Sequence, residues 1–475
     1  MILDTMKRLT LLVNMALAAI VLAGTWPEAL AQPVPVGAAR VDITPDYPVR
    51  LTGYASRVKE SEGVAQRLWA KALAVGADGG EGPALLITVE NCGVPADVTR
   101  EVGTRLKAKA GVAPERIAIC SSHTHSAPCL LGFATNLLAE PVTAEQQQHM
   151  VRYKQQVVDW IEQAALGALA ARKPAQLSWA QGAVGFAMNR RPVKDGRCPG
   201  IGLQGEGPVD RSLPMLCAKD LQGKVVAIVV NYACHATTLG GDLNKIHGDW
   251  PGVAQQCIEA DLPGAIALVS LGCGADANPH PRGDLDKVDR YGRAVADEVK
   301  RLLRGKLTPL APALSARQTR IGLPFNKLPT REELHQQVAA AKAPKTDGTA
   351  KWKASRATAL LAQLDRDKSL PGEIDYPITV WAFGDDLAMV FLPGEVVVDY
   401  VLRLKRELDG SRLWVAAYTN DVPCYIVSKR ILDEGGYEPD SSMIYYGRPG
   451  PLSPVVEDRI VTAVKSLVPA GFAGK

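Results

Sequence analysis

Residues 120–128 read CSSHTHSAP and carry two histidines, His123 and His125, directly after an apolar run. Histidine is scarce in this chain, with seven among 475 residues. Side chains two apart on a strand point to the same face, so both imidazoles are able to face one pocket. Because an isolated pair of this kind is more often packed or capping than metal-binding, its interpretation depends on what other residues reach the same place.

Polar residues also follow three further apolar runs, each of which is typical of a buried strand. They are His235 after residues 224–234, Glu395 after residues 385–394, and Asp276, Asn278 and His280 after residues 264–272. Ligands of α/β proteins bind beyond the strand ends, so these junctions are able to converge. Two histidines and a carboxylate suit zinc, whose catalytic sites keep one position open for water. Zinc lowers the pKa of that water toward about 7 and polarises a carbonyl, as amide or ester hydrolysis requires.

Two aspartates near these junctions each have two interpretations. Asp249, in the stretch HGDWPG, is either a partner of a ligating histidine or the N-cap of a helix that starts at Pro251. Asp276 either orients a ligand or caps its glycine-rich turn.

Composition and charge exclude some classes of function. The net charge is +4, and lysine and arginine are spread along the chain without a basic run, so nucleic acid is not an expected partner. Residues 1–31 have a positive start, an apolar core and a small-x-small cleavage site, which predict a signal peptide and an exported protein, periplasmic or secreted. The nine cysteines contain no CxxC pair, and we expect some to form disulfides, with Cys198–Cys217 the preferred pair.

The remaining pattern predicts an α/β fold of mixed β-sheets with flanking helices in a single large catalytic domain, residues 32–475. Strands are expected at 36–45, 67–77, 83–93, 116–122, 224–234, 264–272 and 385–395. Helices are expected at 96–111, 143–172, 253–261, 286–305 and 397–408, and a helical surface insert at about 329–369. The helix at 143–172 opens with Thr143 and has Gln146 three residues on, a capping-box arrangement.

Taken together, these stretches resemble the N-terminal catalytic domain of the neutral/alkaline, non-lysosomal ceramidase family, without its C-terminal immunoglobulin-like domain. The resemblance runs in order through VGAARVDITP, LTGYASR, CSSHTHSAP, MNRRP, NYACHATT, HGDWPG, LGCGADANP, FLPGE and YIVSKRILDEGGYE. It implies a zinc amidase whose metal is held by His123, His235, Glu395 and Tyr446, with Tyr445 as the alternative tyrosine. It also implies that His125 faces the reacting carbonyl and that Arg190 holds an oxygen of substrate or product.

The chain departs from the family pattern at two positions of interest. Asn278 stands where the family has a serine, and Leu432 where it has a tyrosine. Asparagine is no nucleophile, but its amide is able to donate to an oxyanion, so we count Asn278 and Asp276 with His125 and Arg190 as candidate catalytic residues.

The expected function is therefore cleavage of an N-acyl amide bond by metal-activated water, in a ceramide-like lipid or a related amide. Contact with a membrane surface is expected to be transient at most. Two alternatives are a zinc hydrolase that acts on esters or other small substrates, and a catalytically silent binding protein on the same fold. The second alternative predicts lost ligands, whereas His123, His235 and Glu395 are all present.

Overall fold

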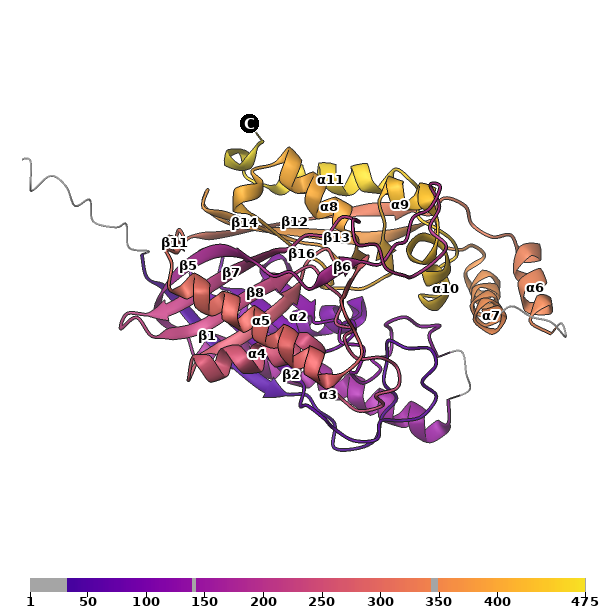
Figure 1. Ribbon diagram of the computed structural model, residues 1–475, viewed down its shortest axis with the longest axis horizontal. Helices are drawn as coiled ribbons and strands as arrows, with labels where there is room; N and C mark the ends of the chain where they lie inside the picture. Colours follow the sequence, from indigo (N-terminus) through magenta and orange to yellow (C-terminus); the bar gives the residue numbers. More distant parts are fainter. Residues whose placement is uncertain (1–31, 139–141, 343–348, 475) are drawn as a thin grey trace, which may run out of the picture.

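Two β-sheets pack face to face, and helices cover their outer faces (Figure 1). The structure is a computed structural model that describes residues 32–138, 142–342 and 349–474, so the predicted signal peptide lies outside the described residues. Apolar side chains of both sheets fill the space between them, among them Leu86 and Val229 of the large sheet and Trp381 and Phe391 of the small one. The fold confirms the predicted α/β architecture with mixed sheets and flanking helices.

The large sheet has nine strands in the order β4-β3-β2-β1-β5-β7-β8-β9, with β11 paired to β5. Neighbouring strands are antiparallel except β3–β4 and β8–β9, which are parallel. Its strands are β1 (Val34–Asp42), β2 (Trp69–Val75), β3 (Ala84–Val89), β4 (Ile117–Ser121), β5 (Lys173–Ala183), β7 (Ser212–Asp220), β8 (Val225–Tyr232), β9 (Ile266–Leu271) and β11 (Thr308–Pro309).

The small sheet has the order β12-β13-β14-β16. Its strands are β12 (Leu314–Pro324), β13 (Glu373–Phe383), β14 (Leu387–Phe391) and β16 (Leu413–Ala416). Two short pairs lie beyond the strand ends, namely β6 (Ala187–Asn189) with β10 (Ala277–Pro279), and β15 (Glu395–Val396) with β17 (Tyr425–Ile426). The sequence analysis did not predict β5, β7, β12 or β13.

Helices α2 (Ala96–Ala110) and α3 (Ala144–Ala170) cover one part of the large sheet, and α4 (Asp249–Asp261) and α5 (Leu285–Leu303) cover another. The predicted capping box of α3 is present, because Thr143 and Gln146 exchange side-chain and backbone hydrogen bonds. Helices α8 (Val398–Glu407) and α11 (Val456–Leu467) cover the small sheet (Figure 1). No helix among the described residues is long and apolar enough to cross a membrane.

A pair of helices projects from the small sheet between β12 and β13 (Figure 1). Helix α6 (Arg331–Ala340) and helix α7 (Ala350–Asp367) pack on each other through a small apolar cluster of their own, which includes Leu334 and Leu360. Two further short helices follow in the C-terminal region, α9 (Lys429–Glu434) and α10 (Ser442–Tyr445), and α10 contacts α7.

The large sheet curls so that its two edge strands, β4 and β9, approach each other. The chain that continues from β16 lies between them. Tyr418 accepts a hydrogen bond from the backbone of Ser121 on β4, at 3.1 Å, and Ala417 donates one to Leu271 on β9, at 2.9 Å. The ends of β4, β8 and β9 are thereby held beside the end of β14, and these are the ends that carry the candidate site residues.

Glu90 is a buried carboxyl group at the end of β3 that the candidate site does not use. Its side chain accepts hydrogen bonds from the backbone of Trp69, at 2.7 Å, and from the amide of Gln255, at 2.8 Å. Burial raises the pKa of Glu90 from 4.5 to about 7, against the lowering effect of nearby Lys71. The folded protein therefore holds this proton more tightly than the unfolded chain does.

We expect the free energy of unfolding to fall as the pH rises from about 4.5 to about 7, because the folded state must then ionise a buried carboxyl. Glu90 alone accounts for a loss of roughly 3 kcal/mol across that window. Glu90→Gln keeps the shape of the side chain but removes the group that titrates. The hydrogen bond between residues 90 and 255 is kept in this variant, because the Gln255 amide is able to rotate and accept it. Urea unfolding at pH 5 and pH 8 checks this, with Glu407→Gln as a surface control. A difference between wild type and Glu90→Gln that does not change with pH would contradict the assignment.

Candidate metal centre

Two histidine segments run side by side at the heart of the site. Residues 123–125 follow β4 and residues 235–237 follow β8, and the two are joined by a parallel bridge between Thr124 and Ala236. His123 has φ of 53°, a left-handed conformation that is uncommon for any residue but glycine and that persists only where the surroundings impose it. This turn aims the imidazole of His123 at His235. Their ring centroids are 4.7 Å apart.

Glu395 completes the cluster from the other sheet. It opens β15, directly after the Pro-Gly turn that ends β14. Its Oε2 lies 3.2 Å from Nε2 of His123 and 3.1 Å from Nε2 of His235. The three side chains are at most 4% exposed. The three donor atoms all lie within 4.8 Å of one another, as ligands of one ion do.

The other nitrogen of each histidine is bound to a backbone carbonyl. Nδ1 of His123 lies 2.6 Å from the carbonyl oxygen of Cys92, and Nδ1 of His235 lies 3.0 Å from that of Gly274. A carbonyl only accepts hydrogen bonds, so both Nδ1 atoms carry a proton, and in the neutral form of each histidine Nε2 presents a lone pair toward Glu395. Three electron-pair donors then meet at one point. That arrangement fits a bound cation.

The electrostatics of the cluster favour one positive charge. Burial opposes a charge on His123, but the carboxylate of Glu395 outweighs it and raises the pKa of His123 to about 10. Burial, helped by the nearby Arg190 guanidinium, lowers the pKa of His235 to about 4. His235 is therefore neutral at pH 7. The site draws in a cation next to Glu395, and a proton fills that role when no metal does.

His125 lies at the open side of the cluster. Its Nε2 is 3.1 Å from Nε2 of His123, and its ring is only partly buried. The ring packs against Gly53, where an added Cβ would come within 2.5 Å of the imidazole. Burial and the two neighbouring histidines lower the pKa of His125 well below its usual range, so it is neutral. His125 is thus the histidine best placed to meet a substrate.

Three tyrosines must be distinguished around Glu395. Tyr446 donates a hydrogen bond to Oε1 of Glu395, the oxygen that faces away from the two histidines. Tyr445 is half-buried and packs its ring against Trp352 instead. Tyr425, which the sequence analysis missed, has its hydroxyl 3.4 Å from Nε2 of His235. Tyr425 lies near the cluster because it pairs with Glu395 in the parallel β15–β17 ladder. No local sequence pattern predicts this pairing.

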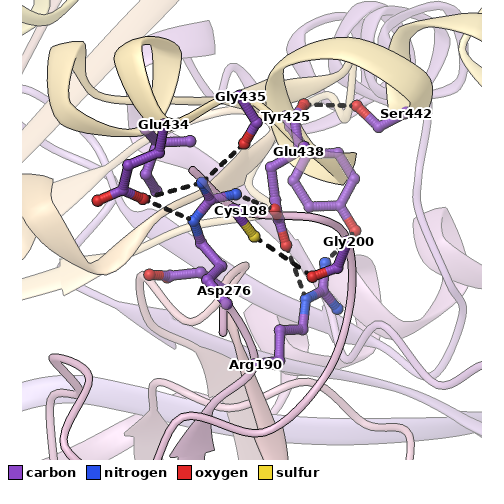
Figure 2. Close-up of polar contacts among 12 residues, drawn as sticks. Arg190, Cys198, Gly200, Asp276, Tyr425, Glu434, Gly435, Glu438 and Ser442 are labelled. Atoms are coloured by element: carbon purple, nitrogen blue, oxygen red, sulfur yellow. Dashed lines mark hydrogen bonds and ion pairs between the residues drawn. The ribbon is translucent and has the colours of Figure 1, made fainter. Parts of the chain in front are cut away.

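Arg190 is a buried cation beside the cluster, and Figure 2 shows it next to Tyr425 and Glu438. Its Nη1 lies 3.1 Å from Nε2 of His235 and donates to Oδ1 of Asn278 at 3.3 Å. Its other nitrogens bind the hydroxyl of Tyr425 at 2.9 Å and the carboxylate of Glu438 at 2.9 Å. Although burial disfavours the charge, Tyr425 and Glu438 raise the pKa of Arg190 well above its usual value.

Asn278 stands next to Arg190 and is 9% exposed. Its Oδ1 also accepts a hydrogen bond from the hydroxyl of Thr237, at 3.2 Å. The carbonyl end of the amide is therefore engaged by the protein. The amino end is the part left to donate to another molecule.

The structure gives the two aspartates positions behind the histidine segments. Asp276 accepts hydrogen bonds from Asn189 on β6, at 3.1 Å, and from the backbone of Val398 at the start of α8, at 2.9 Å. Asp249 is the first residue of α4 and accepts from the backbone of Thr238 and Leu239, just after His235. Neither carboxylate hydrogen-bonds a ligand histidine, because backbone carbonyls already hold both Nδ1 atoms. Asp249 also accepts a hydrogen bond from the backbone of Trp250 in the first turn of α4, at 2.7 Å. Each instead fixes the backbone on which site residues stand.

The expected disulfide between Cys198 and Cys217 is wrong. All nine cysteines are free, and all nine lie within the described residues. Cys217 is in β7 inside the core, whereas Cys198 lies in the loop near Glu434 and donates to the carbonyl of Gly200 (Figure 2). Cys92 is near the cluster, with Sγ 3.7 Å from Nδ1 of His123, but burial raises the pKa of its thiol and keeps it protonated.

Comparison with known proteins agrees with this fold. The model of the neutral/alkaline non-lysosomal ceramidase family, N-terminal part, matches residues 35–270, and this region of the chain belongs to that family. It is 27% identical over 268 residues to a neutral ceramidase of Drosophila pseudoobscura pseudoobscura and 26% identical over 272 residues to one of Drosophila melanogaster. Each alignment covers 52% of this chain and 36% of the relative, so the matched region spans about a third of those proteins.

The solved structures extend the likeness of fold to nearly the whole chain. A neutral ceramidase from Pseudomonas aeruginosa superposes with a TM-score of 0.69 at 18% identity, covering 94% of this chain and 76% of its own. A ceramidase complexed with C2 gives a TM-score of 0.68 at 16% identity and covers 94% and 77%. The chain thus has the fold of these enzymes and a cluster able to hold a metal.

Arg191 shares with Arg190 the buried carboxylate of Glu438. Its guanidinium binds the second oxygen of Glu438 and also Glu434, at 2.9 Å. Because Glu438 is 1% exposed, Arg191→Met leaves part of a buried carboxylate unpaired and lowers the free energy of unfolding by about 3–5 kcal/mol. Arg191→Lys keeps the charge but not the paired N–H donors of a guanidinium, so its loss in the free energy of unfolding is expected to be smaller than that of Arg191→Met. Urea unfolding measures both, and Arg320→Met, at an exposed ion pair, is the control. Equal losses in Arg191→Met and the control would contradict this role.

Proposed function

We propose that the protein is an exported zinc-dependent hydrolase that cleaves the N-acyl amide bond of a ceramide-like lipid or a related amide. The observation that carries this proposal is the meeting of His123, His235 and Glu395 around one point, with both histidines oriented by backbone carbonyls. Export rests on the signal peptide predicted at residues 1–31, with a periplasmic or extracellular destination.

Zinc is the metal that this donor set favours. Two imidazoles and one carboxylate are a common set of protein ligands in catalytic zinc sites, which leave room for water. When bound, zinc supplies an activated water and polarises the carbonyl of the substrate. A phenol oxygen is also able to bind a metal. The hydroxyl of Tyr425 lies beside Nε2 of His235, whereas the hydroxyl of Tyr446 is already hydrogen-bonded to Oε1 of Glu395. We therefore propose Tyr425 rather than Tyr446 or Tyr445 as the fourth protein donor.

The neighbouring residues have the properties that amide hydrolysis requires. The reaction adds water across the C–N bond, so one proton must reach the leaving amine nitrogen and a carboxylate remains. His125 is neutral and open to the substrate, so it is able to take a proton from water and deliver it to that nitrogen. The fixed charge of Arg190 and the amino end of Asn278 are placed to stabilise the negative charge that develops on the carbonyl oxygen.

Support for an N-acyl amide as substrate comes from the relatives, which are named neutral ceramidases. Asn278 does not supply a nucleophile, which leaves water as the attacking group. Esters are the competing substrate class, because the same residues serve either carbonyl.

Two single substitutions test the division of labour within the histidine pair. His123→Ala removes a ligand and is expected to lower bound zinc to under about a tenth of the wild-type stoichiometry. His125→Ala is expected to keep the zinc and to slow turnover by about a hundredfold or more. Elemental analysis of the purified proteins and a rate assay measure the two effects. Loss of zinc in His125→Ala would show that the pair was assigned the wrong way round.

The substrate class is tested with the zinc-loaded protein and a matched panel of N-acyl amides, ceramide included, and the corresponding esters. We expect release of fatty acid from at least one amide, with the metal chelated as the negative control. Absence of bound zinc would contradict the site. Turnover of esters alone would replace amide cleavage with the competing class.

A further inference from the structure

Four aromatic rings form a continuous row that leads away from the candidate metal centre. The ring centroids of Tyr425 and Tyr437 are 5.6 Å apart, those of Tyr437 and Tyr445 are 6.5 Å apart, and those of Tyr445 and Trp352 are 5.8 Å apart. The inner end is at Arg190, whose guanidinium carbon lies 5.6 Å from the centroids of both Tyr425 and Tyr437. The outer end is on α7, in the helical pair between β12 and β13.

Exposure changes along the row in the way expected of a binding surface. Tyr425 is 3% exposed, whereas Tyr437, Tyr445 and Trp352 are all only partly buried. Partly buried tyrosine and tryptophan rings offer a large apolar surface. These side chains have few rotatable bonds, so little conformational entropy is lost when a ligand binds them. Such rings line pockets for apolar ligands.

The outer end of the row is fixed by a buried side chain. Asn136 is 6% exposed, and its amide nitrogen donates both to the carbonyl of Trp352 on α7, at 2.8 Å, and to that of Ile444 on α10, at 2.9 Å. Its backbone nitrogen donates to the carbonyl of Tyr445, at 2.9 Å. The indole of Trp352 in turn donates to the carbonyl of Leu137, at 3.2 Å. The start of α7 is therefore tied to the site.

We infer that the three partly buried rings of this row, Tyr437, Tyr445 and Trp352, form the subsite that binds the acyl chain of the substrate, with the buried Tyr425 closing its inner end, an inference that rests on the proposed function. The carbonyl end of an acyl group lies beside Arg190, and the hydrocarbon chain then follows the rings toward α7. Adjacent rings are inclined to each other by 80°, 38° and 68°. They therefore present edges and faces to a slender ligand and form no flat platform for a sugar or another planar ring.

The test is a series of amides that differ only in their acyl chain, from acetyl through hexanoyl and dodecanoyl to hexadecanoyl, with zinc-loaded protein. Each methylene that becomes buried raises kcat/KM by up to about fourfold, so wild type should prefer long chains. Trp352→Ala is expected to lower kcat/KM for the hexadecanoyl amide at least about tenfold more than for the acetyl amide, mainly through KM. Asn136→Ala, which releases α7, should shift the preference in the same direction.

Trp160→Ala is the matched control, because Trp160 is a partly buried tryptophan on α3, beside Tyr153. It should keep the chain-length preference of wild type. The inference is overturned if Trp352→Ala keeps that preference too, or if Trp160→Ala loses it equally.

A separate measurement keeps this inference distinct from the proposed function. If no acyl amide is hydrolysed, the proposed function fails, and calorimetric binding of dodecanoate and acetate then tests the row alone. Wild type is expected to bind dodecanoate more tightly than acetate. In Trp352→Ala the ratio of the two dissociation constants is expected to be at least about tenfold smaller than in wild type. Equal affinity of the two anions for wild type would overturn the inference whatever the reaction is.

Discussion

The candidate metal centre depends on the backbone hydrogen bonds by which the chain after β16 joins the two edges of the large sheet. The bonds from Ser121 to Tyr418 and from Ala417 to Leu271 hold β4 and β9 on either side of one segment. Without them, the residues after β4 and those after β8 and β9 would lie at opposite ends of an open sheet. The small sheet thus does two things at once, since it closes the curl of the large sheet and delivers Glu395.

The ligand atoms are fixed by the same backbone. The carbonyls of Cys92 and Gly274, which follow β3 and β9, select the tautomer of His123 and His235. Asp249 and Asp276 bind backbone nitrogens beside His235 and Glu395. Rigid strand ends and buried aspartates therefore position the site before any ion binds, which lowers the ordering cost of binding.

Local patterns in the sequence predicted much of this and missed the rest for physical reasons. Strand ends that carry His123, His235 and Glu395 were visible because a buried strand is an apolar run and its end is polar. The capping box at Thr143 is likewise a local signal. Strands β12 and β13 alternate buried and exposed residues irregularly, so their runs gave no clear period. Strand β5 does alternate, but its buried positions hold only Ala175, Leu177 and Trp179 among polar residues, too weak a signal to single it out.

Long-range pairing was the part that local patterns did not contain. The position of Tyr425 follows from the register of β15 with β17, which joins residues thirty apart in the chain. The partners of Asp249 and Asp276 could not be predicted either, because a carboxylate serves a helix, a ligand or a distant backbone equally well. The cysteines were misjudged because an exported chain was taken to favour disulfides, while the fold buries eight of the nine as free thiols.

Charge balance explains why a cation site and a buried arginine are able to coexist. Arg190 is neutralised by Glu438 (Figure 2). Arg191 shares Glu438 and is neutralised further by Glu434. Both arginines therefore have carboxylate partners on the side away from the histidines. Glu395 accepts a hydrogen bond from the neutral Tyr446 and faces the two imidazoles, and its carboxylate raises the pKa of His123 to about 10. A bound metal ion would take the place of the proton that His123 holds beside Glu395, while the charge of Arg190, already paired with Glu438, would stay as it is.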